Sequence, residues 1–251
     1  MHAIGLTVDG LVRNNNEDAI FYSLGPIGPL PNLFIVADGM GGHNAGEVAS
    51  AKAVEYGCNF IQDATEVYEL GADAIMDILV TAAMQANNDV FALATSNPDY
   101  YGMGTTLSAC TVLGDTLAVA HIGDSRIYTI SPGQIKQITT DHTFVEEMVK
   151  AGNLSPEEAR THPRRNVLTR VLGCDPLIPA DGFLYDLADA QFVLLCSDGL
   201  TDMLTDSVIM ELVNQNATLE DKAQNLINAA NANGGVDNIS VIIIDVKGEV
   251  I

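Results

Sequence analysis

The chain has few basic residues: 11 lysines and arginines stand against 33 aspartates and glutamates, giving a formal net charge of −22. Proteins hold nucleic-acid phosphates and anionic membrane surfaces with lysine and arginine, so the composition argues against both kinds of partner. The same acidity favours the accumulation of divalent cations near the protein. It also makes any arginine close to a carboxylate cluster a candidate for holding an anion.

Long apolar runs are also missing. No run approaches the ~20 residues that a membrane span needs, and the first residues lack the basic and then apolar order of a secretory signal. We therefore expect a cytoplasmic protein with no membrane association. Hydrophobic residues make up 47% of the 251 residues, and no linker, repeat or low-complexity segment divides them. One large domain covering residues 1–251 is expected.

Cysteine is scarce, and its spacing excludes thiol chemistry. Cys58, Cys110, Cys174 and Cys196 lie far apart and form no C-x-x-C pair, so neither a zinc site nor a redox pair is expected. We expect buried free thiols. Cys196 lies near a carboxylate at a strand end, but a thiol in such a place is more often a small core residue.

The feature that stands out is an apolar strand that ends in a carboxylate. Residues 33–37 are apolar, Asp38 follows directly, and then comes the glycine cluster that includes Gly39. Glycines there let the backbone approach a ligand closely and adopt positive φ in a turn. An Asp-Gly turn alone would be the simpler interpretation. The pattern recurs, however, where the apolar residues 192–196 lead to Asp198-Gly199.

Two further aspartates lie beside glycine at strand boundaries. Asp124 follows the predicted strand 117–122, and Asp237 precedes the predicted strand 239–246. Four such carboxylates are costly to bring together unless cations neutralise them. The pattern therefore predicts an all-oxygen site for several hard cations such as Mg²⁺ or Mn²⁺. Asp38 could bridge two ions, and the Gly39 carbonyl could reach one of them.

An arginine and a histidine would complete a site for phosphoryl hydrolysis. Arg13 carries a guanidinium suited to gripping phosphate oxygens, although a surface role is the alternative. His43 follows Asp38 by five residues and could protonate a departing oxygen. Glu17 and Asp18 are either solvated charges or partners of metal-bound water. Two ions ~3.5–4 Å apart could activate a shared water, so no covalent phosphoenzyme is required. No C-x-x-x-x-x-R loop or D-x-D nucleophile is present.

Hydrophobic periodicity places these residues on a mixed framework. It predicts helices over 45–61 and 72–94, and a hairpin of strands 105–112 and 117–122 around Gly114-Asp115. Threonines at 205 and 218 are expected to cap two later helices. Residues 139–180 resemble an inserted lid with two short helices and a basic cluster. Arg164 and Arg165 in this cluster are candidates for binding a phosphorylated substrate, although a solvated loop is an equal alternative.

The elements in their order resemble the motif series of the metal-dependent serine/threonine protein phosphatases of type 2C, in the short bacterial single-domain form. The series spans almost the whole chain and is specific as a set, whereas each motif alone is weak. It comprises Arg13 with Asn16-Glu17-Asp18, Asp38-Gly39-Met40-Gly41-Gly42-His43, Gly102-Met103-Gly104-Thr105-Thr106, His121-Ile122-Gly123-Asp124-Ser125-Arg126, residues 139–142, Cys196-Ser197-Asp198-Gly199-Leu200-Thr201-Asp202 and Gly235-Val236-Asp237-Asn238.

The resemblance implies an α+β fold, a four-layer α-β-β-α sandwich of two antiparallel sheets flanked by helix pairs, with 139–180 as a flap. It implies Mn²⁺- or Mg²⁺-dependent hydrolysis of phosphoserine and phosphothreonine in proteins, by a metal-activated bridging water and without a phosphoenzyme. The implied partners are phosphorylated proteins, substrates of a serine/threonine kinase, and the expected state is a monomer.

The resemblance also implies a role for each residue that matches a motif. Asp38 would bridge two core ions, the Gly39 carbonyl would ligate one, and Asp198 with Asp237 would ligate the other. Asp124, with Asp198 and Asp202, matches a weaker third ion. The remaining roles are a water-mediated contact for Asp18, phosphate binding for Arg13 and general acid catalysis for His43.

Three other functions stay open at this stage. A catalytically silent relative could bind phosphoproteins as a scaffold, although the retained aspartates, Arg13 and His43 argue against it. The same site could hydrolyse small phosphate esters or nucleotides. An acidic divalent-cation buffer would bind ions without turnover, but no EF-hand spacing is present.

Overall fold

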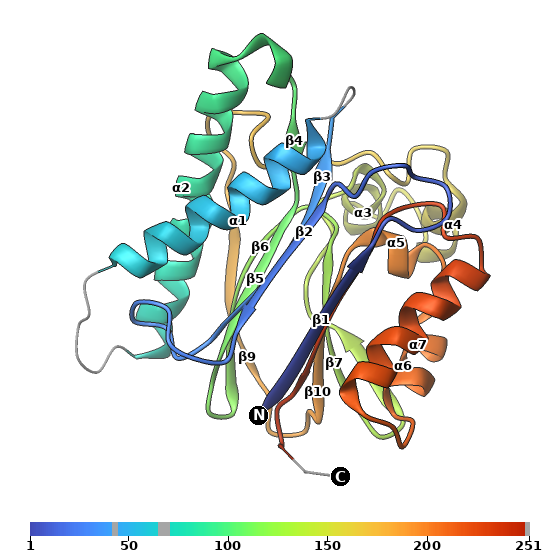
Figure 1. Cartoon of the computed structure of the whole chain (residues 1–251). Helices are drawn as coiled ribbons and strands as arrows, with labels where there is room; N and C mark the ends of the chain where they lie inside the picture. Colours follow the sequence, from blue (N-terminus) through green and yellow to red (C-terminus); the bar gives the residue numbers. More distant parts are fainter. Residues whose placement is uncertain (42–44, 65–70, 249–251) are drawn as a thin grey trace.

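Two antiparallel β-sheets stack face to face, and helices cover both outer faces (Figure 1). The computed structural model describes residues 1–41, 45–64 and 71–248. One sheet has the strand order β1 (His2–Val8), β11 (Ile239–Asp245), β10 (Phe192–Cys196), β7 (Arg126–Ser131) and β8 (Gln134–Gln137). The other has the order β2 (Asp18–Ser23), β3 (Leu33–Met40), β5 (Leu107–Leu113), β6 (Thr116–Ile122) and β9 (Asp181–Asp186), and β4 (Gly104–Thr105) pairs with the end of β3.

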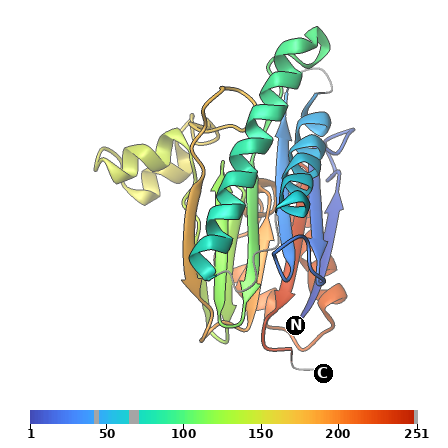
Figure 2. The same ribbon diagram turned by 90° about the vertical axis from the view of Figure 1, so that its left-hand side faces the viewer.

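Helices pack on each sheet from outside. The long helices α1 (Gly46–Asp63) and α2 (Ala72–Ser96) lie against the β2–β9 sheet, and the short helix η1 (Pro98–Tyr100) follows them (Figure 2). The opposite sheet carries α5 (Asp198–Thr201), α6 (Asp206–Val213) and α7 (Leu219–Ala232). This arrangement confirms the predicted α+β sandwich of four layers. Within the described ranges, no helix has the length and apolar character needed to cross a membrane.

Alternation along the strands creates three apolar layers. In β3, Leu33 and Ile35 pack toward α1 and α2, whereas Phe34 and Val36 fill the space between the sheets. In β10, Leu194 packs toward α7 and Leu195 packs between the sheets. Successive side chains of a strand point to opposite faces, so a strand covered on both sides must be apolar throughout. This explains the continuous apolar runs that precede Asp38 and Asp198.

Several predicted elements have the expected bounds. Leu113 pairs with Thr116, so Gly114-Asp115 is a two-residue hairpin loop, and Gly114 has the positive φ of +62° that such a loop favours. Thr218 caps α7 by accepting a hydrogen bond from the Asp221 amide. In the 139–180 segment, the helices α3 (Phe144–Lys150) and α4 (Pro156–Thr161) form as predicted, and Ser155 completes a capping box. Figure 2 shows these two helices, drawn in yellow, projecting sideways from the sandwich.

Other predictions were wrong. Strand β3 continues through Asp38 and Gly39 to Met40, because β4 supplies a partner strand where a turn was expected. The strand predicted over 105–112 is interrupted between β4 and β5, and β9 was not predicted. Thr205 occupies an N-cap position, but its side chain makes no capping hydrogen bond. Cys174 is exposed, not buried.

Candidate metal centre

The predicted aspartates meet at one edge of the sandwich. In the antiparallel pair β2–β3, Asp18 lies directly opposite Asp38. Asp198 begins α5 immediately after β10, and Asp237 lies just before β11, which neighbours β10. Like charges placed opposite one another on neighbouring strands destabilise a sheet, so this arrangement requires a compensating group.

Burial and mutual repulsion disfavour the ionised forms of Asp18, Asp38, Asp124 and Asp198 in the metal-free protein. Burial raises the pKa of Asp38 well above its ordinary value, and the charges of Asp18 and Asp198 add to the rise. Burial, followed by the charge of Asp124, likewise raises the pKa of Asp198. For Asp18 and Asp124, burial is again the main cause, and it raises the pKa to about 6 and about 7 respectively. A bound cation would reverse these shifts.

One buried oxygen is left unsatisfied. The Oδ2 atom of Asp18 accepts a hydrogen bond from the Ser197 hydroxyl at 2.8 Å. Its Oδ1 atom is buried and has no hydrogen-bond partner among the described residues. A buried acceptor without a partner costs about 1–3 kcal/mol, and more when the group is charged. A nearby hydrated cation would remove this cost.

The donor set fits hard divalent ions, but its side chains do not point to one common centre in this structure. Within residues 1–41, 45–64 and 71–248, no three carboxylate, histidine or cysteine side chains form a group that could hold an ion as they stand. Arg13 Nη2 lies 2.8 Å from Oδ2 of Asp237, and Arg165 Nη2 lies 3.3 Å from Oδ2 of Asp202. Both arginines thus hold carboxylates that were predicted to ligate metal. All the candidate donors are oxygens, the type that Mg²⁺ and Mn²⁺ prefer.

Gly39 is required for a close approach of the backbone and not for a turn. It has no positive φ, contrary to the prediction, because it lies in β3. A Cβ atom at this position would lie 2.2 Å from the Gly46 carbonyl oxygen and 2.4 Å from that of Glu17. The Gly39 amide donates to the same Glu17 oxygen at 3.0 Å. Any side chain at residue 39 would therefore push the β2 and α1 segments away from Asp38.

Asn238 joins the Arg13 loop to the Asp237 turn. Its Oδ1 atom accepts from the Glu17 amide at 2.9 Å, and its Nδ2 atom donates to the Asn15 carbonyl at 2.8 Å. The sequence predicted only that Asn238 belongs to a motif, not that it makes these contacts. A polar residue directly after Asp237 at a strand start was the available signal. Nothing in the sequence indicated its hydrogen-bond partners, which lie more than 220 positions away.

Thr106, between β4 and β5, supports Asp38. The Asp38 amide donates to Oγ1 of Thr106 at 2.9 Å, and the Thr106 amide donates to the Asp38 carbonyl at 2.8 Å. The Thr106 hydroxyl also lies 2.6 Å from the hydroxyl of Ser125, directly after Asp124. A continuous hydrogen-bonded path therefore joins the backbone of Asp38 to the turn that carries Asp124.

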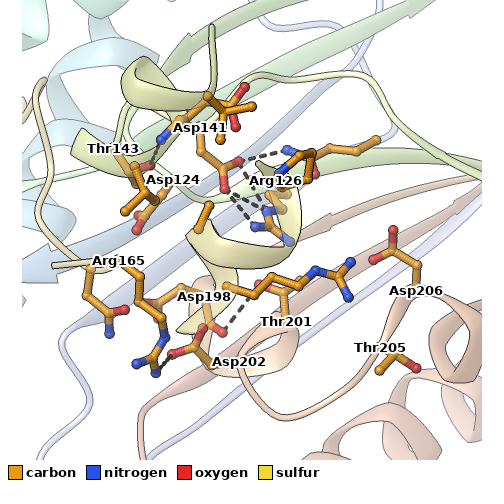
Figure 3. Close-up of a pocket in the computed structure, with 18 of the residues that line it drawn as sticks. Asp124, Arg126, Asp141, Thr143, Arg165, Asp198, Thr201, Asp202, Thr205 and Asp206 are labelled. Atoms are coloured by element: carbon orange, nitrogen blue, oxygen red, sulfur yellow. Dashed lines mark hydrogen bonds and ion pairs between the residues drawn. The ribbon is translucent and has the colours of Figure 1, made fainter. Parts of the chain in front are cut away.

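A groove of about 690 Å³ opens beside these carboxylates. Asp124, Asp198 and Asp202 line one part of it, and α3, α4 and Arg165 line another. Figure 3 shows Arg165 directed toward Asp202, and Arg126 directed toward Asp141. Arg164 does not line the groove, because its guanidinium stacks 3.4 Å from the centre of the Phe144 ring.

The structure thus brings most of the predicted site residues together. Asp18, Asp38, Gly39, Asp198 and Asp237 lie at one end of the sandwich, with Arg13 attached to Asp237. Asp124 and Asp202 line the adjoining groove, whereas Arg164 lies away from it. His43 lies outside the described residues.

Known proteins match this chain over nearly its full length. The family described as Protein phosphatase 2C matches residues 12–235. The serine/threonine phosphatase Stp of Listeria innocua is 37% identical over 247 residues, which are 98% of this chain and 96% of the relative. The crystal structure of the serine/threonine phosphatase Stp1 from Staphylococcus aureus has a TM-score of 0.89 at 35% identity, over 97% of this chain and 94% of that one.

A third similar protein has been crystallised with metal. The catalytic domain of the serine/threonine protein phosphatase PstP, in complex with two manganese ions, has a TM-score of 0.82 and 36% identity, over 97% of both chains. These matches confirm the resemblance and the class of enzyme that it implied, a protein serine/threonine phosphatase. The chain belongs to the protein phosphatase 2C family.

Proposed function

We propose that this chain hydrolyses phosphoserine and phosphothreonine in proteins with the help of Mn²⁺ or Mg²⁺, using water as the nucleophile and forming no covalent phosphoenzyme. The observation that carries the proposal is the convergence of buried, mutually repelling carboxylates at one end of the sandwich, where one Asp18 oxygen has no partner among the described residues. The manganese complex of a similar catalytic domain supports the choice of metal.

Each carboxylate has a proposed place in this site. Asp38 and the Gly39 carbonyl would hold two core ions together with Asp198 and Asp237, and Asp18 would contact them through water. Asp124, Asp198 and Asp202 would hold a weaker third ion. When bound, such ions supply Lewis acidity and lower the pKa of water toward neutrality. Strands β3 and β10, the hydrogen bond that the Asp38 amide donates to Thr106 and the one that Ser197 donates to Asp18 would fix where the carboxylates meet the ions.

Arg13 is proposed to orient the phosphoryl group. Its side chain is about half exposed, and it already lies against Asp237 at the edge of the cluster. The hydrogen bond to Asp237 raises the pKa of the guanidinium, so Arg13 is charged at every working pH. A planar guanidinium can donate two parallel hydrogen bonds to phosphate oxygens. His43 is proposed as the general acid that protonates the serine or threonine oxygen as it departs.

We propose a single catalytic domain over residues 1–251, with residues 139–180 as a flap over the groove. Arg165 lines that groove and is the better placed of the two predicted substrate arginines. The substrates would be phosphoproteins produced by a serine/threonine kinase, and the enzyme would act as a cytoplasmic monomer.

A substrate comparison tests the proposal. The protein would be offered a phosphothreonine peptide, p-nitrophenyl phosphate and a nucleoside triphosphate, each with Mn²⁺, Mg²⁺ or a chelator. We expect the phosphopeptide to be hydrolysed with either metal and activity to vanish with the chelator and return when Mn²⁺ is restored. Preferred hydrolysis of the nucleotide would favour a small-molecule hydrolase. Metal binding without turnover of any substrate would contradict enzymatic function.

A further inference from the structure

Three exposed apolar side chains lie beside Arg13. Leu11 is 67% exposed, Val12 61% and Val236 46%. Leu11 and Val12 directly precede Arg13 in the loop after β1, and Val236 directly precedes Asp237 in the loop before β11. Figure 1 shows these two loops, one blue and one red, next to each other. Single exposed apolar residues are common, but a group of them beside a candidate catalytic site needs an explanation.

Close packing makes the two loops one unit. The Leu11 amide donates to the Gly235 carbonyl at 2.7 Å, and Arg13 Nη2 lies 2.8 Å from Oδ2 of Asp237. Gly10 has a φ of +78°, and a Cβ atom there would collide with the Asp237 carbonyl oxygen. Any side chain at residue 10 would therefore push the loops apart. The exposed apolar side chains are thus carried on a backbone that is held at several points.

The apolar side chains also meet across the two loops. A Cβ atom built at Gly235 would lie 3.0 Å from Cγ of Leu11, so Leu11 packs against this glycine. A Cβ atom built at Gly234 would lie 3.5 Å from Cγ1 of Val236 and 3.6 Å from Sδ of Met203. Val236 and Met203 therefore lie against the same glycine. We define the apolar rim as Leu11, Val12, Met203 and Val236.

Met203 connects the apolar rim to the groove. It is half-buried, and it lines the groove together with Asp202 and Leu204. Methionine side chains are flexible and are common on surfaces that accept varied partners. A peptide that lies in the groove could therefore continue over the apolar rim while staying in contact with the protein.

Spacing along the chain limits how far the apolar rim lies from a phosphoryl group at Arg13. Leu11 is two residues from Arg13, and two residues of extended backbone span at most about 7 Å. The same length of extended peptide separates a phosphorylated residue from the residue two positions away. The apolar rim is therefore within reach of the first or second residue on one side of the phosphorylated residue.

The apolar rim is already ordered before a substrate binds. Asn238 Nδ2 donates to the Asp9 carbonyl at 3.1 Å and to the Asn15 carbonyl at 2.8 Å, so it holds the loop on both sides of Leu11 and Val12. A surface that is held in its binding conformation avoids most of the entropic cost of ordering it on association. Covering its apolar area is then a net gain in binding free energy.

We propose that the apolar rim is a specificity site that binds an apolar side chain within two positions of the phosphorylated residue in a protein substrate. The inference rests on the proposed function, because it takes Arg13 as the residue that orients the phosphoryl group. It names a class of substrate, namely phosphoproteins with an apolar residue beside the phosphoserine or phosphothreonine.

A scan of phosphothreonine peptides tests the proposal. Each peptide has alanines around the phosphothreonine, and one of the two positions before or after it carries leucine or glutamine. With Mn²⁺ present, we expect leucine to exceed glutamine about tenfold in kcat/KM at one of these positions, a usual effect of an apolar contact on specificity. In the double variant Leu11→Gln/Val236→Thr, which changes only exposed side chains, this preference should largely disappear.

Two comparisons separate specificity from damage to the site. Leu24→Gln is the matched control and should keep the leucine preference, because Leu24 is also exposed but follows the end of β2 that is remote from Asp18. The loss of the double variant on the leucine peptide should exceed any loss on p-nitrophenyl phosphate, which has no flanking residue.

A binding measurement provides a readout without turnover. The leucine and glutamine peptides would carry a non-hydrolysable phosphonate in place of the phosphate, and calorimetric titration would give Kd for each. We expect the unaltered protein and Leu24→Gln to bind the leucine peptide more tightly. The double variant should bind both peptides with similar affinity.

The outcomes distinguish the two proposals. If the unaltered protein hydrolyses no phosphopeptide, the proposed function fails. If it hydrolyses phosphopeptides but prefers leucine at no position, or if the preference survives in the double variant, the specificity site is overturned and the proposed function stands. Equal losses on the peptide and on p-nitrophenyl phosphate would also overturn it. So would a dimer that the double variant converts to a monomer in sedimentation analysis, because the apolar rim would then join two copies of the chain.

Discussion

Two groups of carboxylates in this molecule differ in their partners, because one group is paired with arginines and the other is not. Around the 139–180 segment, two carboxylates each have an arginine: Asp141 lies 2.7 Å from Arg126, and Asp181 lies 2.6 Å from Arg170. At the end of the sandwich, no lysine or arginine among the described residues forms an ion pair with Asp18, Asp38, Asp124 or Asp198. We call these four the unpaired cluster.

The contrast shows where the protein relies on its own side chains and where it relies on a ligand. The chain has only 11 basic residues, yet two of its arginines are placed on Asp141 and Asp181, at the two ends of the segment. Although burial opposes it, the hydrogen bonds from Arg170 and His142 lower the pKa of Asp181. Burial instead raises the pKa of Asp18, and no lysine or arginine among the described residues forms an ion pair with it. The unpaired carboxylates at this end of the sandwich thus depend on a cation bound from solution.

The largest effect is expected for Asp38→Asn in the unpaired cluster. It removes the carboxylate proposed to bridge both core ions. We expect kcat to fall about a thousandfold, which corresponds to a loss of several kcal/mol of transition-state stabilisation by the metal ions. The same change removes repulsion, so the chelator-treated variant should unfold at a higher urea concentration than the unaltered protein. Phosphopeptide kinetics and urea titration measure both. Asp115→Asn, at an exposed hairpin tip, should change neither.

The opposite sign is expected for Asp141→Asn in the paired group. Asp141 accepts hydrogen bonds from Arg126 and from Gln137, and the substitution would leave the Arg126 guanidinium largely buried without its counter-charge. Breaking such a pair costs about 3 kcal/mol in the free energy of unfolding. Urea titration in chelator checks this value. Asp206→Asn is the control, because Asp206 is exposed and accepts only from Tyr128. A gain in stability for Asp141→Asn would contradict the proposed difference between the paired group and the unpaired cluster.

A third difference concerns pH in the metal-free protein. The folded-state pKa of Asp18 is raised to about 6 and that of Asp124 to about 7, against about 3.9 in an unfolded chain. Between these limits the folded state binds more protons than the unfolded state, so the free energy of unfolding should fall as pH rises from about 4 to about 7. Urea titrations in chelator test the slope. Saturating Mn²⁺ should abolish or reverse it, and a flat profile in chelator would show that the cluster is already compensated.

The family resemblance implied the four layers, whereas local sequence signals predicted the buried strands and the position of most cluster members. Apolar runs covered on both faces and aspartates at their ends are properties of a few consecutive residues. The end of β3 could not be predicted, because the Asp38-Gly39 pair is typical of a turn and only the pairing of Gly39 with Thr105 extends the strand. Strand β9 was missed because it lies at a sheet edge, is only partly buried and begins with Asp181-Gly182.

The supporting residues of the site could not be predicted for a related reason. The roles of Thr106 and Asn238 arise from contacts with residues 19 to more than 220 positions away. No local pattern marks such contacts. The basic cluster of the 139–180 segment shows the same limit: the sequence could not distinguish Arg165, which reaches Asp202, from Arg164, which stacks on Phe144.

The smallest effect is expected at Arg13, which stands between the two groups because it pairs with Asp237 beside the unpaired cluster. If Arg13 serves the phosphate, Arg13→Lys should raise KM for a phosphopeptide by about fivefold, since lysine cannot donate two parallel hydrogen bonds. Stability should change by less than about 1 kcal/mol, because the pair is half exposed. Steady-state kinetics and urea titration, with Lys52→Met as an exposed-pair control, separate the two effects. If Arg13→Lys instead lost as much stability as Asp141→Asn and left KM unchanged, Arg13 would be a structural arginine. The carboxylates at this end of the sandwich would then be compensated by a protein side chain, as those of the paired group are.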